Sequence, residues 1–171
     1  TMGFTPMDGL MMATRCGSID PGIILHVMRK YRLSADDVDR ALNKESGLLG
    51  VSGVSADFRK VQDDARIGSQ TAQLAFEMFA YRVRVGIGAM AAAVDGAHAL
   101  VFTAGIGEHS LQLRAEVCRH LGFLGVKIDP KLNENCRPDA DISAADATCR
   151  VLVIHTREDV TIAREVERVL T

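Results

Sequence analysis

The sequence predicts an α/β fold, because an apolar strand followed by a polar turn and a helix occurs twice in its second half. The first such segment has its strand over 99–104 and its helix over 111–121. The second has its strand over 150–154, and its helix begins near Thr156. With 171 residues, 47% hydrophobic and 25% charged, the chain has the composition of one ordinary packed domain. That length is too short for a self-contained enzyme of two lobes.

The amino-terminal half is predicted to begin with a helical hairpin over roughly 20–47. Asp20-Pro21 places a capping carboxylate before a proline at the first helical position, so a helix over about 20–31 follows. Ser34-Ala35-Asp36-Asp37 has the form of a capping box and opens a second helix, which Gly47 can stop.

The remaining segments differ in composition. The glycines and serines of 46–55 favour loop and strand, and the polar stretch 125–148 favours extended, loop-rich chain. From 67 to about 96, apolar residues cover nearly every face of a long helix, which must be buried or covered by a partner. The terminal helix has one apolar face, made by Ile162, Val166 and Val169.

Charge and hydropathy argue against two classes of partner. The 20 Lys and Arg residues and 22 Asp and Glu residues give a formal net charge of −2, so nucleic acid is not expected. The longest apolar stretch, 85–94, is half of the roughly 20 residues that a membrane span needs, and no signal peptide is visible. We therefore expect a cytoplasmic protein that makes no membrane contact. The cysteines lack metal or redox spacing and are expected to be reduced structural thiols: Cys16, Cys118, Cys136 and Cys149.

Two candidate sites follow the predicted strands. The turn Gly105-Ile106-Gly107 lets backbone N–H groups approach a ligand such as a nucleotide, although a tight turn without a ligand has the same pattern. Glu158 occupies the equivalent position after the second strand, where a carboxylate can hold Mg²⁺. The alternative is a helix start in which Thr156 and Asp159 form a capping pair.

Other polar residues have open interpretations. Arg15 interrupts an apolar segment, and its guanidinium suits a phosphoryl group or carboxylate, or alternatively a structural salt bridge. Asp57-Phe58-Arg59 can be a helix start with an exposed ion pair. His109 and His155 adjoin the two candidate turns, and both are expected to be solvated because no metal-ligand spacing is present.

Four segments, taken in order, resemble the acetate kinase family across essentially the whole chain. They are MGFTPMDGLMMATRCGSIDP at 2–21, SGVSADFR at 52–59, FTAGIGE at 102–108, and Thr156-x-Glu158 with Ile162-Ala163. The resemblance implies a ribonuclease-H-like domain of the acetate/sugar-kinase/actin superfamily with a helical insertion. Residues 1–171 would then form the carboxy-terminal lobe of a two-lobed kinase whose amino-terminal lobe is absent.

The same resemblance implies reversible phosphoryl transfer from ATP to acetate, with Mg²⁺, in a homodimer that forms through the carboxy-terminal lobe. Arg15 matches the arginine that stabilises the phosphoryl group in the transition state, and Glu158 matches the magnesium-associated glutamate. Nucleotide contacts match Asp57, Phe58, Arg59, Gly105, Ile106, Gly107, Glu108 and His109. Three residues depart from the family pattern, namely His109, His155 and Arg157.

This resemblance implies that the chain alone is inactive, because the other catalytic groups would belong to the absent lobe. A propionate or butyrate kinase of the same family is the nearest alternative. A different class of function is a non-catalytic module for nucleotide binding or dimerisation, and the long apolar helix favours the latter.

Overall fold

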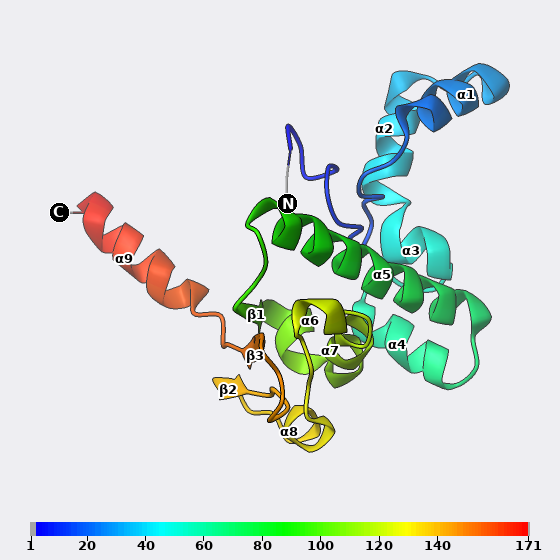
Figure 1. Cartoon of the computed structure of the whole chain (residues 1–171). Coiled ribbons are helices and arrows are strands. Elements are labelled where there is room, and N and C mark those ends of the chain that lie inside the picture. Colours follow the sequence, from blue (N-terminus) through cyan, green and yellow to red (C-terminus); the bar gives the residue numbers. More distant parts are fainter. Residues whose placement is uncertain (1–2, 171) are drawn as a thin grey trace. The chain divides into compact units, whose positions relative to one another are not determined.

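Figure 1 shows the computed structural model of the chain, which describes residues 3–170. The chain divides into two compact units, Thr1–Ala93 and Val94–Thr171. Within the described residues, helices make up the regular structure of the first unit, and the sheet lies in the second. The predicted α/β class is confirmed.

The predicted helical hairpin is present at the start of the first unit. The helices of this unit are α1 (Pro21–Tyr31), α2 (Ala35–Lys44), α3 (Gly47–Ser52), α4 (Phe58–Arg66) and α5 (Gln70–Ala93). Asp20 Oδ1 accepts a hydrogen bond from the Gly22 N–H (2.7 Å), which caps α1. Ser34 and Asp37 exchange the two bonds of the capping box at 3.1 Å each, so both helix starts are confirmed.

Gly47 has a different role from the one predicted, because α2 already ends at Lys44 and Gly47 begins α3. Its backbone is left-handed (φ +64°), and a Cβ there would lie 2.2 Å from the Met12 carbonyl oxygen and 2.8 Å from that of Arg15. The loop and strand predicted for 46–55 are therefore wrong. Glycine disfavours helices in general, but here its missing Cβ lets α3 start directly against the Met12–Arg15 backbone.

The predicted long helix is α5, which packs against α3 and α4. Phe79 of α5 meets Phe58 with ring centroids 5.2 Å apart, and the other buried residues of α5 are all alanines. Five of its larger apolar side chains are 39% to 54% exposed. Leu74, Met78, Tyr81 and Val85 recur along one side of the helix, and Met90 lies off that side near its end. One side of α5 is therefore buried within the chain. For the other side, the prediction that a partner covers it still applies.

The second unit is built on a small sheet with strand order β1-β3-β2. Its elements are β1 (Ala99–Phe102), α6 (Ala104–His109), α7 (Leu111–Cys118), a 3₁₀ turn (Gly122–Leu124), α8 (Pro130–Glu134), β2 (Ala140–Asp141), β3 (Arg150–Val153) and α9 (Glu158–Leu170). β1 and β3 run parallel with Phe102 beside Val153, and β2 pairs antiparallel with β3. Both parallel strands therefore end at the same edge of the sheet, where α6 and the start of α9 follow them.

One local prediction in this unit is wrong, because the glycine turn after β1 is the short helix α6. The stretch 125–148 is mostly loop and extended chain, as predicted, but it also contains the short helix α8. Asp129 caps α8 by accepting from the N–H groups of Lys131 (2.8 Å) and Leu132 (3.0 Å), and Pro130 is the first helical residue. This Asp-Pro start has the same pattern as Asp20-Pro21, but it lies in a stretch whose polar composition favours loop.

No helix among residues 3–170 has the length and apolar content needed to cross a membrane. The four cysteines are free thiols in the structure, as predicted. Cys118 and Cys149 are buried, and this burial raises the pKa of Cys118 to about 12.

Gly47→Ala tests the close approach at α3. We expect it to lower the free energy of unfolding by about 2 kcal/mol or more, because the left-handed backbone and the contact with the Met12 oxygen both oppose a methyl group. Gly122→Ala is the matched control, since its Cβ would meet open space, and it is expected to change stability by less than about 0.5 kcal/mol. Equal effects in urea unfolding would contradict the packing argument.

Candidate functional site

The candidate site of the second unit lies where β1 and β3 end. Thr103 follows β1, and its hydroxyl oxygen lies 2.6 Å from that of Thr156, which follows β3. The Ala104 N–H also donates to the Thr156 hydroxyl oxygen at 2.8 Å. The start of α6 is therefore tied to the connection between β3 and α9, and the predicted capping pair of Thr156 with Asp159 is not formed.

Glu108 makes a second connection between α6 and the residues that follow β3. It is 8% exposed, and its carboxylate accepts from the Thr156 N–H (2.8 Å) and from His155 Nδ1 (2.7 Å). The Thr156 N–H, and next the His155 side chain, lower the pKa of Glu108 to about 2 despite its burial. Because both carboxylate oxygens are already bonded within the chain, a nucleotide contact by Glu108 stays a prediction that this arrangement does not favour. His155 is exposed, as expected, and its Nδ1 also bonds this buried carboxylate.

Arg114 fixes the other end of α6 and was missed in the sequence. It is buried, and its Nη1 donates to the carbonyl oxygens of Gly107 (2.8 Å) and Glu108 (2.7 Å). Its Nε donates to Asn133 Oδ1 (2.7 Å) on α8. Burial lowers the pKa of this guanidinium. An arginine on the same helical face as Val117 is the signal that could have identified it.

The two glycines of α6 have different surroundings. A Cβ on Gly107 would lie 3.3 Å from the backbone of Phe102, so packing within the unit limits this position. Gly105 is exposed, and a Cβ there would meet no atom within 4 Å. The exposed His109 donates a hydrogen bond from Nδ1 to the Gly105 carbonyl oxygen at 2.8 Å. The α6 surface at Gly105 is therefore open, and the chain's own contacts do not require glycine there.

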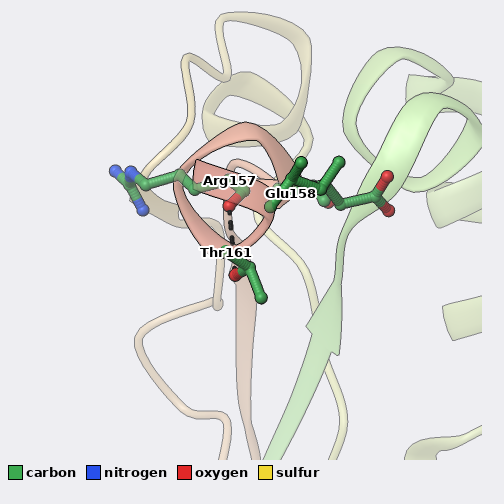
Figure 2. A pocket seen from close by; sticks show the side chains of 5 residues that line it. Arg157, Glu158 and Thr161 are labelled. Atoms are coloured by element: carbon green, nitrogen blue, oxygen red, sulfur yellow. Dashed lines mark hydrogen bonds between the residues drawn. The ribbon is translucent and has the colours of Figure 1, made fainter. Parts of the chain in front are cut away.

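A hollow of about 550 Å³ lies at the start of α9, lined by Thr156, Arg157, Glu158, Thr161 and Ile162. In Figure 2 the side chains of Arg157 and Glu158 point in opposite directions. Arg157 donates to the Asp139 carboxylate at 2.6 Å, whereas Glu158 has no hydrogen-bond or ion-pair partner among the described residues. The part of the chain that the structure describes has no cluster of three or more His, Cys, Asp and Glu residues that could hold a metal ion. Glu158 would therefore need further ligands from outside these residues.

The remaining candidates lie in the first unit. Arg15 is half-buried, with Nε 3.3 Å from Asn43 Oδ1 and Nη1 3.9 Å from the Met12 sulfur. It forms no ion pair within residues 3–170, so the structural alternative of a salt bridge is not found.

The segment 57–59 forms a helix start with an exposed ion pair. Asp57 caps α4 and pairs with Arg59 at 2.9 Å, and hydrogen bonds from the Arg59 side chain and N–H lower the pKa of Asp57. The Phe58 ring is buried against Phe76 and Phe79. Nucleotide contact by this segment stays a prediction, and Asp57 and Arg59 are its accessible members.

The pH dependence of the unfolding free energy in Glu108→Gln tests whether the Glu108 carboxylate connects the two strand ends. Since the folded pKa of about 2 lies below the ordinary 4.5, the ionised carboxylate stabilises the fold above pH 4.5, and this stabilisation is lost as the pH falls toward 2. Urea unfolding across that range is expected to show a shallower loss of stability in Glu108→Gln than in the unmodified chain. Glu158→Gln, which removes a carboxylate without a partner, is the matched control. If the unfolding free energy depended on pH identically in the two variants, the stabilising contact of Glu108 with His155 and Thr156 would be contradicted.

Comparison with known proteins identifies relatives along nearly the full chain. A model of the acetokinase family matches residues 1–164. The acetate kinase of Trichormus variabilis is 54% identical over 165 residues, which cover 96% of this chain and 41% of that protein. The acetate kinase of Heliobacterium modesticaldum is 50% identical over 99% of this chain and 43% of its own length.

Solved structures give the same result. The crystal structure of Porphyromonas gingivalis acetate kinase matches with a TM-score of 0.92 and 40% identity, over 99% of this chain and 43% of that one. A propionate kinase from Francisella tularensis matches with a TM-score of 0.88 and 38% identity, over 96% and 42% respectively. The chain thus spans about two fifths of the length of these relatives. By sequence and by fold, the chain belongs to the acetokinase family.

Proposed function

We propose that the chain is the carboxy-terminal lobe of an acetate kinase, which transfers a phosphoryl group reversibly between ATP and acetate to give acetyl phosphate and ADP. The observation that carries the proposal, within the family, is the state of Arg15. Its guanidinium is half-buried and has no carboxylate partner among the described residues. A guanidinium in this state keeps its full charge and its outer N–H groups for an anionic ligand.

The proposed roles follow from what phosphoryl transfer requires. The reaction depends on alignment of donor and acceptor and on neutralisation of the phosphoryl oxygens, with little covalent chemistry by the protein. Arg15 would stabilise the transferred group, and the open α6 surface at Gly105 would receive the nucleoside. The free carboxylate of Glu158 fits Mg²⁺, which proteins commonly bind through one or two carboxylates together with substrate phosphates. When bound, Mg²⁺ would neutralise phosphate charge.

Two other functions have support. A propionate or butyrate kinase is favoured by the match to the Francisella tularensis propionate kinase. A non-catalytic nucleotide-binding or dimerisation module is favoured by the exposed apolar side of α5. The first differs from acetate kinase only in the length of the acyl chain, and the second differs in having no turnover.

A chimera tests the proposed activity. The chain replaces the matching 41% of Trichormus variabilis acetate kinase, and acetyl phosphate formation from ATP and acetate is measured. We expect the chimera to be active and the 171-residue chain alone to be inactive. Arg15→Leu is expected to lower kcat by about 100-fold or more. Arg119→Leu, at an exposed arginine directly after α7, is the matched control and is expected to change kcat by less than about twofold.

The same chimera separates the alternatives. Glu158→Gln is expected to raise the Mg²⁺ concentration needed for half-maximal activity. Faster turnover of propionate or butyrate than of acetate would favour a propionate or butyrate kinase. A folded chimera that binds ATP but turns over none of the three acids would favour the non-catalytic module. Full activity in Arg15→Leu would contradict the proposed role of Arg15.

We propose also that the protein is a homodimer through the exposed side of α5. A row of large apolar side chains along one side of α5, opposite its buried alanines and Phe79, is typical of a covered surface. Light scattering of the chain at micromolar concentration is expected to give twice the monomer mass. Val85→Lys, within this row, is expected to shift the mass toward monomer, and a monomer in the unmodified chain would contradict the proposal.

A further inference from the structure

The guanidinium of Arg15 is held at one edge only. Nε donates to Asn43 Oδ1 at 3.3 Å, and Nη1 contacts the Met12 sulfur at 3.9 Å. An arginine has five N–H donors, so most of the outer edge formed by Nη1 and Nη2 is left without an acceptor among residues 3–170. The contact with Asn43 therefore sets the direction of the side chain and leaves its outer edge available.

The amide of Asn43 is itself held in one orientation. Its Nδ2 donates to Asp39 Oδ1 at 2.9 Å, one turn earlier on α2. A carboxylate only accepts and a guanidinium only donates, so a single orientation of the amide satisfies Asp39 and Arg15 together. A flipped amide would turn its NH₂ group toward the cation and its oxygen toward the carboxylate. Asp39 thus fixes the oxygen that Arg15 uses.

The backbone around this pair is bonded to the end of α2 on both sides of Arg15. The Thr14 hydroxyl donates to the Asn43 carbonyl oxygen at 2.8 Å, and the Cys16 N–H donates to the Leu42 carbonyl oxygen at 3.0 Å. The Cα of Arg15 and the amide of Asn43 are therefore parts of one bonded segment. Side-chain direction is the remaining freedom, and Asn43 limits it.

We propose that Asn43 is a positioning residue for Arg15, with Asp39 fixing its amide, and that its neutrality matters as much as its geometry. The inference rests on the proposed role of Arg15 in phosphoryl transfer. A carboxylate in direct contact would orient the guanidinium equally well, but it would also neutralise the charge that a phosphoryl group needs. An amide orients the side chain without this loss. The carboxylate of Asp39 bonds Asn43 and not Arg15 itself, so Asn43 separates it from the guanidinium.

Four variants in the chimera test the inference. Asn43→Leu keeps the number and branching of the side-chain heavy atoms and removes both hydrogen bonds, and we expect kcat to fall between about 10-fold and 100-fold while the KM for ATP stays nearly constant. Asn135→Leu is the matched control, because this amide bonds only locally, to the Lys131 carbonyl oxygen on α8. Asp39→Asn keeps an acceptor for the Asn43 amide and is expected to retain most activity. Asp39→Leu removes that acceptor, and its kcat is expected to lie between those of Asp39→Asn and Asn43→Leu.

A swap variant separates orientation from charge. Asp39→Asn combined with Asn43→Asp keeps the net charge and the chain of hydrogen bonds, but places the carboxylate directly on Arg15. We expect the guanidinium to stay ordered and kcat to fall nevertheless. Wild-type activity in the swap variant would overturn the claim about neutrality, and activity of Asn43→Leu equal to that of Asn135→Leu would overturn the positioning role.

A readout independent of activity distinguishes this inference from the proposed function. In the 171-residue chain with isotope-labelled arginine, the Arg15 Nε–H signal is followed by NMR. It is expected to shift and to exchange faster with water in Asn43→Leu, and to stay protected in the swap variant. An unchanged signal in Asn43→Leu overturns the inference even if Arg15 is catalytic. If Arg15→Leu is fully active while the signal shifts as expected, the contact is real and the proposed function is at fault.

Discussion

The buried carboxylate of Glu108 joins the two strand–helix segments of the second unit, and the rest of the candidate site depends on it. Parallel pairing of β1 and β3 brings two strand ends to one edge, but it does not fix the chain that leaves each strand. Glu108 does this by accepting from the Thr156 N–H and from His155, while Arg114 holds the carbonyl oxygens at the end of α6. An anion and a cation thus hold the same short helix from two sides. These contacts also fix the surface near Gly105 and Glu158.

The first unit uses backbone contact where the second uses charge. Gly47 allows α3 to start against the carbonyl oxygens of Met12 and Arg15, and the Leu48 N–H donates to the Met12 oxygen at 2.9 Å. The Arg15 segment is therefore held by main-chain groups that need no charged partner. This leaves the guanidinium with its charge intact, which a salt bridge in the same place would have cancelled.

Local signals in the sequence were sufficient for the parts of the fold that depend on neighbouring residues. The caps at Asp20 and Ser34 and the apolar strands at 99–102 and 150–153 are of this kind. Gly47 and His155 are different, because each owes its role to a residue more than thirty positions away: Met12 for Gly47, and Glu108 for His155. No periodicity or spacing records such contacts. Of the candidate site, the sequence located the segments, and the contacts within them came from the structure.

The burial of Cys118 has a consequence for how the second unit can be followed in solution. The thiolate is the nucleophile that attacks a thiol reagent, and a pKa of about 12 leaves almost no thiolate at neutral pH while the residue stays buried. Reaction at Cys118 therefore reports opening of the packing around α7, and the half-buried Cys16 serves as the reference for a thiol that reacts without such opening.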